Sequence, residues 1–161
     1  MMDGINFSIT GNLVGKFEET ARMMPKIEEK ALYRAAYFLR DQIRNELATK
    51  VPKATVRNPK YTDTLVDAVG FSGVDGASLT VNALGSRKTG SGTFRTRFFE
   101  AGTQERFQRK RNGIKLNKKK SLGSLPAKPF FQGAVQANQN QAVSLMRDTI
   151  TKYITEIFDG Q

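Results

Sequence analysis

The chain has 161 residues, a length that suits one domain with its own core, and it contains neither Cys nor His. These absences exclude disulfides, a Cys nucleophile and the commonest ligands of transition metals, and they remove the commonest general base near neutral pH. There are 26 Lys and Arg against 15 Asp and Glu, for a net charge of +11, and no run approaches the ~18 apolar residues of a membrane span. We therefore expect a single domain over residues 1–161, with no catalytic site, cofactor, metal or membrane partner.

The N-terminal third predicts a short strand followed by a long helix. Ile5, Phe7 and Ile9 alternate with polar residues, which is typical of a half-buried strand. From about residue 15 the period becomes helical, and Pro25 marks a kink or a new first turn. An apolar stripe at steps of four follows, which we expect to lie on a sheet: Ile27, Ala31, Ala35, Leu39, Ile43 and Leu47.

The middle of the chain predicts three strands. Residues 65–72 and 78–84 are predicted to be antiparallel neighbours joined by the turn Gly-Val-Asp-Gly. In residues 94–100, aromatic and Thr side chains alternate with arginines, which predicts a third strand. A last amphipathic helix is expected from about residue 133 to 158. This order predicts an α+β fold, in which an antiparallel sheet is packed by two long amphipathic helices.

Most of the net charge lies in one short segment. Residues 106–120 contain eight basic residues and no acidic one. Asn112 and Gly113 both tolerate the positive φ of a type I′ turn, so we expect a protruding basic β-hairpin, inserted at about residues 105–120. Its candidate interaction residues, toward another subunit, a partner ring or DNA, are Arg106, Arg109, Lys110, Arg111, Lys115, Lys118, Lys119 and Lys120.

Three interpretations of this hairpin remain open. Exposed basic ribbons are often no more than solvated. Nucleic-acid binding would use the charge, but proteins that bind single strands interleave aromatic side chains for base stacking, and this segment has only Phe107. Contact with an acidic surface of a partner protein is the third, and the motifs on either side of the hairpin favour it.

Two other motifs have simple structural explanations. The loop GSRKTGSGT suggests a phosphate-binding loop, but Ser91 stands where the required Lys belongs, so a mobile surface loop is expected. Asp63, Asp67 and Glu100 could supply carboxylates to Mg²⁺. However, positions i and i+4 of a strand lie roughly 13 Å apart, which does not favour a metal site.

Three further motifs occur in order along the chain. The first motif is YTDTLVDAVG, in which Thr62 and Leu65 match the protein family named below; Asp63 stands where that family usually has Gly. FFEAGTQ contributes Glu100, Gly102 and Thr103. LPAKPFFQGAV contributes Pro126, Ala127, Pro129, Phe130 and Ala134. Together these motifs resemble those of a family of tailed-phage neck proteins, the tail-completion or head-tail joining proteins.

The matching residues also suggest roles in folding. Gly102 permits a sharp exit from the predicted strand that carries Glu100. Pro126 and Pro129 favour an extended approach, which would seat Phe130 or its neighbour against the sheet before the last helix begins.

The resemblance implies a structural virion protein of the phage neck, assembled in the host cytoplasm. Its subunits would form a homo-oligomeric ring of six or twelve that joins the head-closure complex to the tail and surrounds the DNA channel. The implied partners are the head-closure and tail-terminator proteins of the virion, with DNA passing through without sequence specificity. A basic nucleic-acid-binding accessory protein and a tail terminator ring are the alternatives.

A charge comparison argues against the hairpin lining the DNA channel. Duplex DNA carries about one phosphate per 1.7 Å, so a ring about 30 Å tall would face about 18 negative charges. Six hairpins of eight basic residues would present about 48 positive charges, which would hold DNA that must slide. We therefore expect most of these side chains to face another protein surface.

Overall fold

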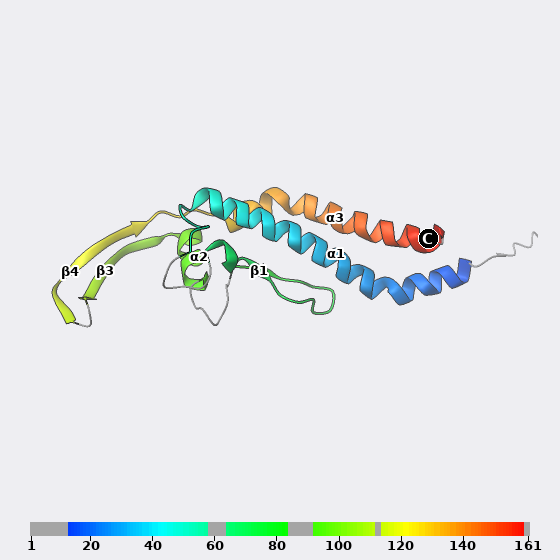
Figure 1. The fold of residues 1–161 in the computed structure, drawn as a ribbon, viewed down its shortest axis with the longest axis horizontal. Coiled ribbons are helices and arrows are strands. Elements are labelled where there is room, and N and C mark those ends of the chain that lie inside the picture. The colour runs from blue at the N-terminus through cyan, green and yellow to red at the C-terminus, as the bar shows by residue number, and fades with distance from the viewer. Residues whose placement is uncertain (1–12, 58–63, 84–91, 112–113, 160–161) are drawn as a thin grey trace, which may run out of the picture.

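The computed structural model describes residues 13–57, 64–83, 92–111 and 114–159. Figure 1 shows an elongated molecule with two long helices at one end and a two-stranded ribbon at the other. The elements are α1 (Leu13–Lys50), a 3₁₀ helix η1 (Val66–Ala68), β1 (Gly70–Phe71), β2 (Val81–Asn82), α2 (Gly92–Ala101), β3 (Thr103–Arg111), β4 (Ile114–Leu125) and α3 (Phe131–Asp159).

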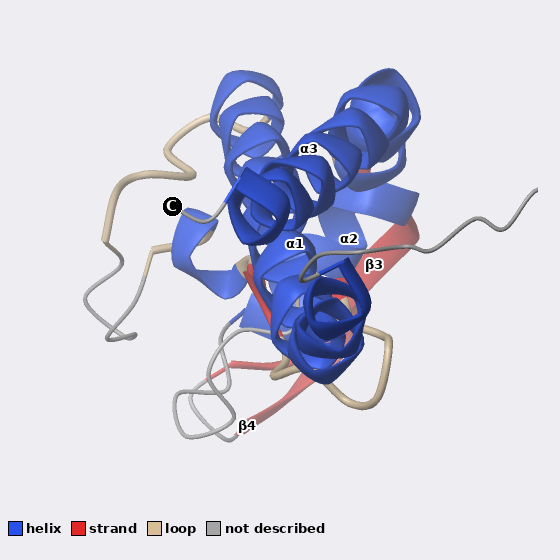
Figure 2. Cartoon of the chain, turned by 90° about the vertical axis from the view of Figure 1, so that its right-hand side faces the viewer, coloured by secondary structure: helices blue, strands red, loops and turns tan. Residues whose placement is uncertain are grey.

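Both predicted long helices are confirmed, but their packing partner differs from the prediction. The stripe of α1 is largely buried, yet it lies against α3 rather than on a sheet. The two helices run antiparallel and side by side, as Figures 1 and 2 show. Pro25 lies inside an unbroken α1, which bends at its N-terminal end in Figure 1. The strand predicted around Ile5 to Ile9 lies outside the described residues.

Small side chains let α1 and α3 approach each other along an arm that extends from the core. The buried residues of this seam are mostly Ala and Thr: Thr20, Ala31, Ala35, Ala36, Ala142 and Thr149. A polar contact also crosses the seam: the Arg34 guanidinium donates a hydrogen bond to the Thr149 hydroxyl at 3.1 Å. Near the free end, the Phe17 and Phe158 rings meet edge to face at 5.2 Å, and the Lys16 ammonium donates to the Phe158 carbonyl.

The first two predicted strands pair as expected but are much shorter. β1 and β2 are antiparallel, with Gly70 opposite Asn82, and each has two residues. The segment predicted to begin the first strand is η1 instead. Thr64 and Asp67 bond each other at its start: the Thr64 hydroxyl donates to the Asp67 carboxylate at 2.7 Å, and the Asp67 amide donates to that hydroxyl at 3.3 Å. This local bonding competes with an extended backbone.

The third predicted strand is wrong, because residues 94–100 belong to α2. The alternation of aromatic residues with arginines was compatible with a strand, but the buried face follows a helical period. Thr96 is buried, and Phe99 and Glu100, three and four residues later, are half-buried. The Thr96 hydroxyl donates to the Ala83 carbonyl at 2.9 Å, which ties α2 to the end of β2.

The core lies where the C-terminal end of α1, η1 and the first turn of α3 meet. Its buried residues are Ile43, Leu47, Val51, Ala54, Leu65, Val69, Phe130 and Ala134. The coarse α+β class is therefore confirmed, with long helices and small antiparallel sheets, but the helices pack on each other and not on one sheet. In the described ranges no helix is long and apolar enough to cross a membrane.

Candidate interaction site at the basic ribbon and its joint

The candidate interaction residues lie on a two-stranded antiparallel ribbon, residues 103–125, formed by β3 and β4. The register places Phe107 opposite Ser121, and irregularities in the pairing follow on both sides. Arg111 and Ile114 are the last pair before the predicted turn, whose residues Asn112 and Gly113 lie outside the described ones.

The ribbon presents its described basic side chains to solvent. Arg106, Arg109, Lys118 and Lys120 are all exposed. The backbones of the other four candidates lie in the same strands: Lys110, Arg111, Lys115 and Lys119. All eight positions predicted from the sequence therefore lie on the ribbon formed by β3 and β4.

Two large apolar side chains of the ribbon are also exposed. Phe107 on β3 is 48% exposed and Leu122 on β4 is 52% exposed. They lie near each other along the ribbon, because Leu122 follows Ser121, the partner of Phe107, at the irregularity before the pair of Arg106 and Gly123. Apolar area beside positive charge suits a protein interface better than contact with a phosphate backbone alone.

The ribbon lacks the packing that usually stabilises two strands. Among the described elements, β3 and β4 pack substantially only on each other. Because an isolated two-stranded ribbon is marginal in water, a partner that supplies negative charge would stabilise this one.

The base of the ribbon is held firmly against the rest of the molecule. Gly102 has φ +71° and ends α2. An added Cβ there would lie 2.8 Å from the Ala127 backbone nitrogen and 2.9 Å from the Leu125 carbonyl oxygen. On the same side, the Leu125 amide donates to the Thr103 hydroxyl at 3.0 Å and the Lys128 amide donates to the Phe99 carbonyl at 2.7 Å.

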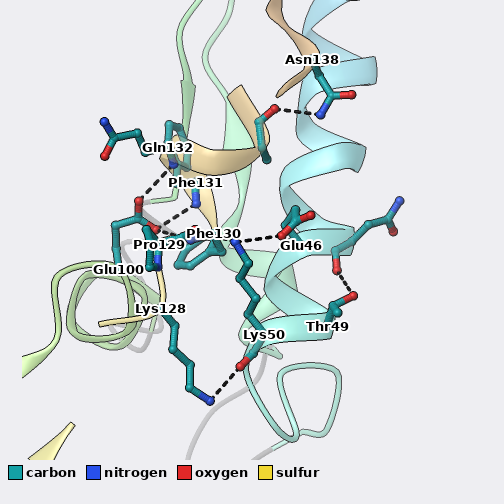
Figure 3. A network of polar contacts seen from close by, with 12 residues as sticks. Glu46, Thr49, Lys50, Glu100, Lys128, Pro129, Phe130, Phe131, Gln132 and Asn138 are labelled. Atoms are coloured by element: carbon teal, nitrogen blue, oxygen red, sulfur yellow. Dashed lines mark hydrogen bonds and ion pairs between the residues drawn. The ribbon is translucent and has the colours of Figure 1, made fainter. Parts of the chain in front are cut away.

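Glu100 on α2 caps the N-terminus of α3, as Figure 3 shows. Its Oε2 accepts the Phe130 and Phe131 amides, each at 2.9 Å, and its Oε1 accepts the Gln132 amide at 3.0 Å. These donors are ones that a helix leaves unpaired at its start, and the negative charge suits the helix dipole. The expected strand position of Glu100 is therefore wrong, but the residue has a clear structural role.

Two lysines tie α1 to the same point. Lys50 at the end of α1 donates to the Pro129 carbonyl at 2.8 Å, and Lys128 donates to the Lys50 carbonyl at 2.9 Å. Phe130, between these contacts, is 1% exposed in the core. Phe130 is therefore buried, but the prediction that it would lie against a sheet is wrong, because it packs among helices and η1.

We call this region the joint. It brings together residues from all three sequence motifs: Leu65, Glu100, Gly102, Thr103, Pro126, Pro129 and Phe130. Thr62 lies outside the described residues. Sequence reasoning missed Lys50 and Lys128, since nothing in their local pattern indicates carbonyls contributed by distant segments.

Two of the three carboxylates considered for magnesium, those of Asp67 and Glu100, accept hydrogen bonds from backbone amides. Hydrogen bonds from the Thr64 hydroxyl and amide lower the pKa of Asp67; burial opposes them in part, and the charge of Arg44 makes a smaller contribution that also lowers the pKa. Glu100 is engaged by three amides. Asp63 lies outside the described part of the chain, and within that part no three acidic residues cluster as a metal site would require.

In comparisons with protein-family models, with curated proteins and with solved structures, nothing matches this chain.

Proposed function

We propose that the protein is a structural virion protein that forms a ring in the neck of a tailed phage. There it would join the head-closure complex to the tail and surround the DNA channel. The observation that carries this proposal is the joint, where residues of all three neck-protein motifs gather around Phe130 and fix the base of the ribbon. Residues far apart in the sequence thus hold the base of the ribbon together.

The elongated form supports assembly as the mechanism. The helical arm and the ribbon extend from opposite sides of the core (Figure 1). A subunit of this form can contact one neighbour through the arm and another protein through the ribbon. Contacts between different surfaces of identical subunits close a ring when the rotation between copies allows it.

The ribbon would act as a protruding basic hairpin that binds an acidic protein surface. Its exposed Phe107 and Leu122 supply apolar area, while its basic residues supply complementarity and partner selection. In the folded subunit alone this ribbon has little support from other elements, so binding would order and stabilise it.

The position of the protein in purified phage particles tests the proposal. Mass spectrometry should detect it in mature virions, and electron microscopy should place it as a ring between the head-closure complex and the tail. Its absence from mature virions would overturn the proposal. A ring at the head-proximal end of the tail tube itself would identify the tail terminator instead.

The charge of the ribbon supports a second candidate, a nucleic-acid-binding accessory protein. This candidate predicts that the free protein binds DNA with an affinity that falls steeply as salt rises, because binding releases counterions. Removing the ribbon charges would abolish that binding. The neck proposal predicts instead that particle assembly is lost while any DNA binding stays weak.

A further inference from the structure

An apolar groove runs between the two long helices on the side of the β1–β2 hairpin. It has a volume of about 240 Å³. Nearly all of its walls are aliphatic side chains and Met, from α1, α3 and the end of the hairpin: Leu32, Leu39, Leu79, Val81, Val143 and Met146. Val143 is 55% exposed at its edge. The volume exceeds the ~30 Å³ of one water several-fold, and apolar walls give water few partners.

The chain contains one segment whose pattern fits this groove. Ile5, Phe7 and Ile9 alternate with polar residues, so an extended backbone would place all three on one face. That face would span ~13 Å from Ile5 to Ile9. The groove follows α1 from Leu32 to Leu39, which is ~10 Å of helix. The apolar face of the segment and the length of the groove therefore match.

The segment cannot fill the groove of its own copy. α1 begins at Leu13, and Leu32 is the groove residue of α1 nearest to that end, ~28 Å away along the helix. Ile9 lies four positions before Leu13, which allows ~14 Å when fully extended, and Phe7 can reach only ~22 Å. Ile5 alone could reach ~28 Å, the near edge of the groove, so Phe7 and Ile9 cannot enter it and an occupying segment would have to come from another copy.

We propose that residues 5–9 of one copy dock in the groove of a second copy. Phe7 would enter between α1 and α3 beside Val143, with Ile5 and Ile9 on either side along the groove. This contact deepens the proposed function, on which it rests for the presence of many copies in one assembly. It would be a heterologous contact, in which each copy donates its N-terminal segment to one neighbour and accepts that of another.

Because the chain has no Cys, single cysteines can test the contact in the full-length protein. One variant carries Ser8→Cys, beside Phe7 on the polar face of the segment, and a second carries Val143→Cys; a control carries Thr155→Cys, at an exposed position of α3 outside the groove. The purified variants are mixed in pairs at high concentration and treated with a short thiol crosslinker. We expect a mixed dimer from the Ser8→Cys and Val143→Cys pair, and none with the Thr155→Cys control.

Further variants decide among the outcomes. Adding Phe7→Ser to the Ser8→Cys chain should abolish the crosslink. A chain carrying both Ser8→Cys and Val143→Cys should crosslink between copies; a crosslink within one copy would overturn the proposal. It would also be overturned by no crosslink at Val143, or by equal crosslinking at Thr155. Particle localisation is independent of this experiment, so failure of the contact and failure of the neck function can be told apart.

Discussion

Gly102 shows how a single residue controls where the ribbon leaves the core. Its φ of +71° ends α2, and the chain turns so closely that the Ala127 and Leu125 backbones occupy the space of a side chain. Gly123, within the ribbon, has the same φ of +71° but no atom within 4 Å of an added Cβ. The two glycines thus separate the effect of backbone conformation from the effect of close packing.

We expect Gly102→Ala to destabilise the protein by about 2–5 kcal/mol, from about 1–2 for the left-handed backbone and about 1–3 for the clash. The matched variant Gly123→Ala should lose only the first part, about 1–2 kcal/mol. Urea unfolding of both variants measures the difference. Equal losses of free energy would show that the close approach at the joint has no energetic importance.

Asp67 should make stability depend on pH. Its folded pKa lies below the ordinary value of 3.8, because the hydrogen bonds from Thr64 favour the charged form. This stabilisation is present above pH 3.8 and is lost as the pH falls through the folded pKa. We expect Asp67→Asn to be less stable than the wild type at pH 7, with the gap shrinking below about pH 4. Unfolding curves over this pH range test it, and a constant gap would contradict it.

At the scale of whole elements, α2 matters because its last turn holds the first turn of α3. Glu100 makes three hydrogen bonds to amides thirty or more residues later, so the start of α3 depends on α2 being folded. The same segment was predicted to be a strand. Alternating aromatic and basic residues fit both periods over seven residues, and the contacts of Thr96 and Glu100 favour the helix.

We expect Glu100→Ala to cost about 1–3 kcal/mol, because three amides at a helix N-terminus lose a charged acceptor. Glu100→Gln should fall between this variant and the wild type, since one amide oxygen remains. The control is Glu156→Ala, which removes only a surface ion pair with Lys152 at 3.6 Å and should cost less than about 0.5 kcal/mol. Thermal unfolding compares the variants. If Glu100→Ala is as stable as the control, Glu100 does not stabilise the protein by capping α3.

At the scale of the molecule, charge and form are distributed unevenly. The basic residues of 106–120 lie on an element that other elements hardly touch, while the hydrophobic core lies at the joint and the arm extends beyond it. Substitutions of the exposed basic side chains of the ribbon should therefore alter partner binding with little effect on the stability of the core.

We expect Lys118→Glu combined with Lys120→Glu to prevent incorporation into particles. The free energy of unfolding should stay within about 0.5 kcal/mol of the wild type, because both side chains are exposed. A matched control, Lys53→Glu with Arg97→Glu, changes the net charge equally at exposed positions outside both the ribbon and the arm. Counting copies per particle by quantitative mass spectrometry compares the two. Equal loss in both variants would show that total charge, and not the ribbon, determines assembly.

The sequence by itself determined the two long helices, the location of the β1–β2 hairpin and the concentration of charge in residues 106–120, because local periodicity or composition is enough to predict each of them. Only the tertiary structure decided what the stripe of α1 packs against, since a period defines an apolar face but not what covers it. It also decided that residues 94–100 are helical and that Glu100 caps α3. That cap joins residues 30 apart in sequence, so it exists only when folding brings the two helix ends together.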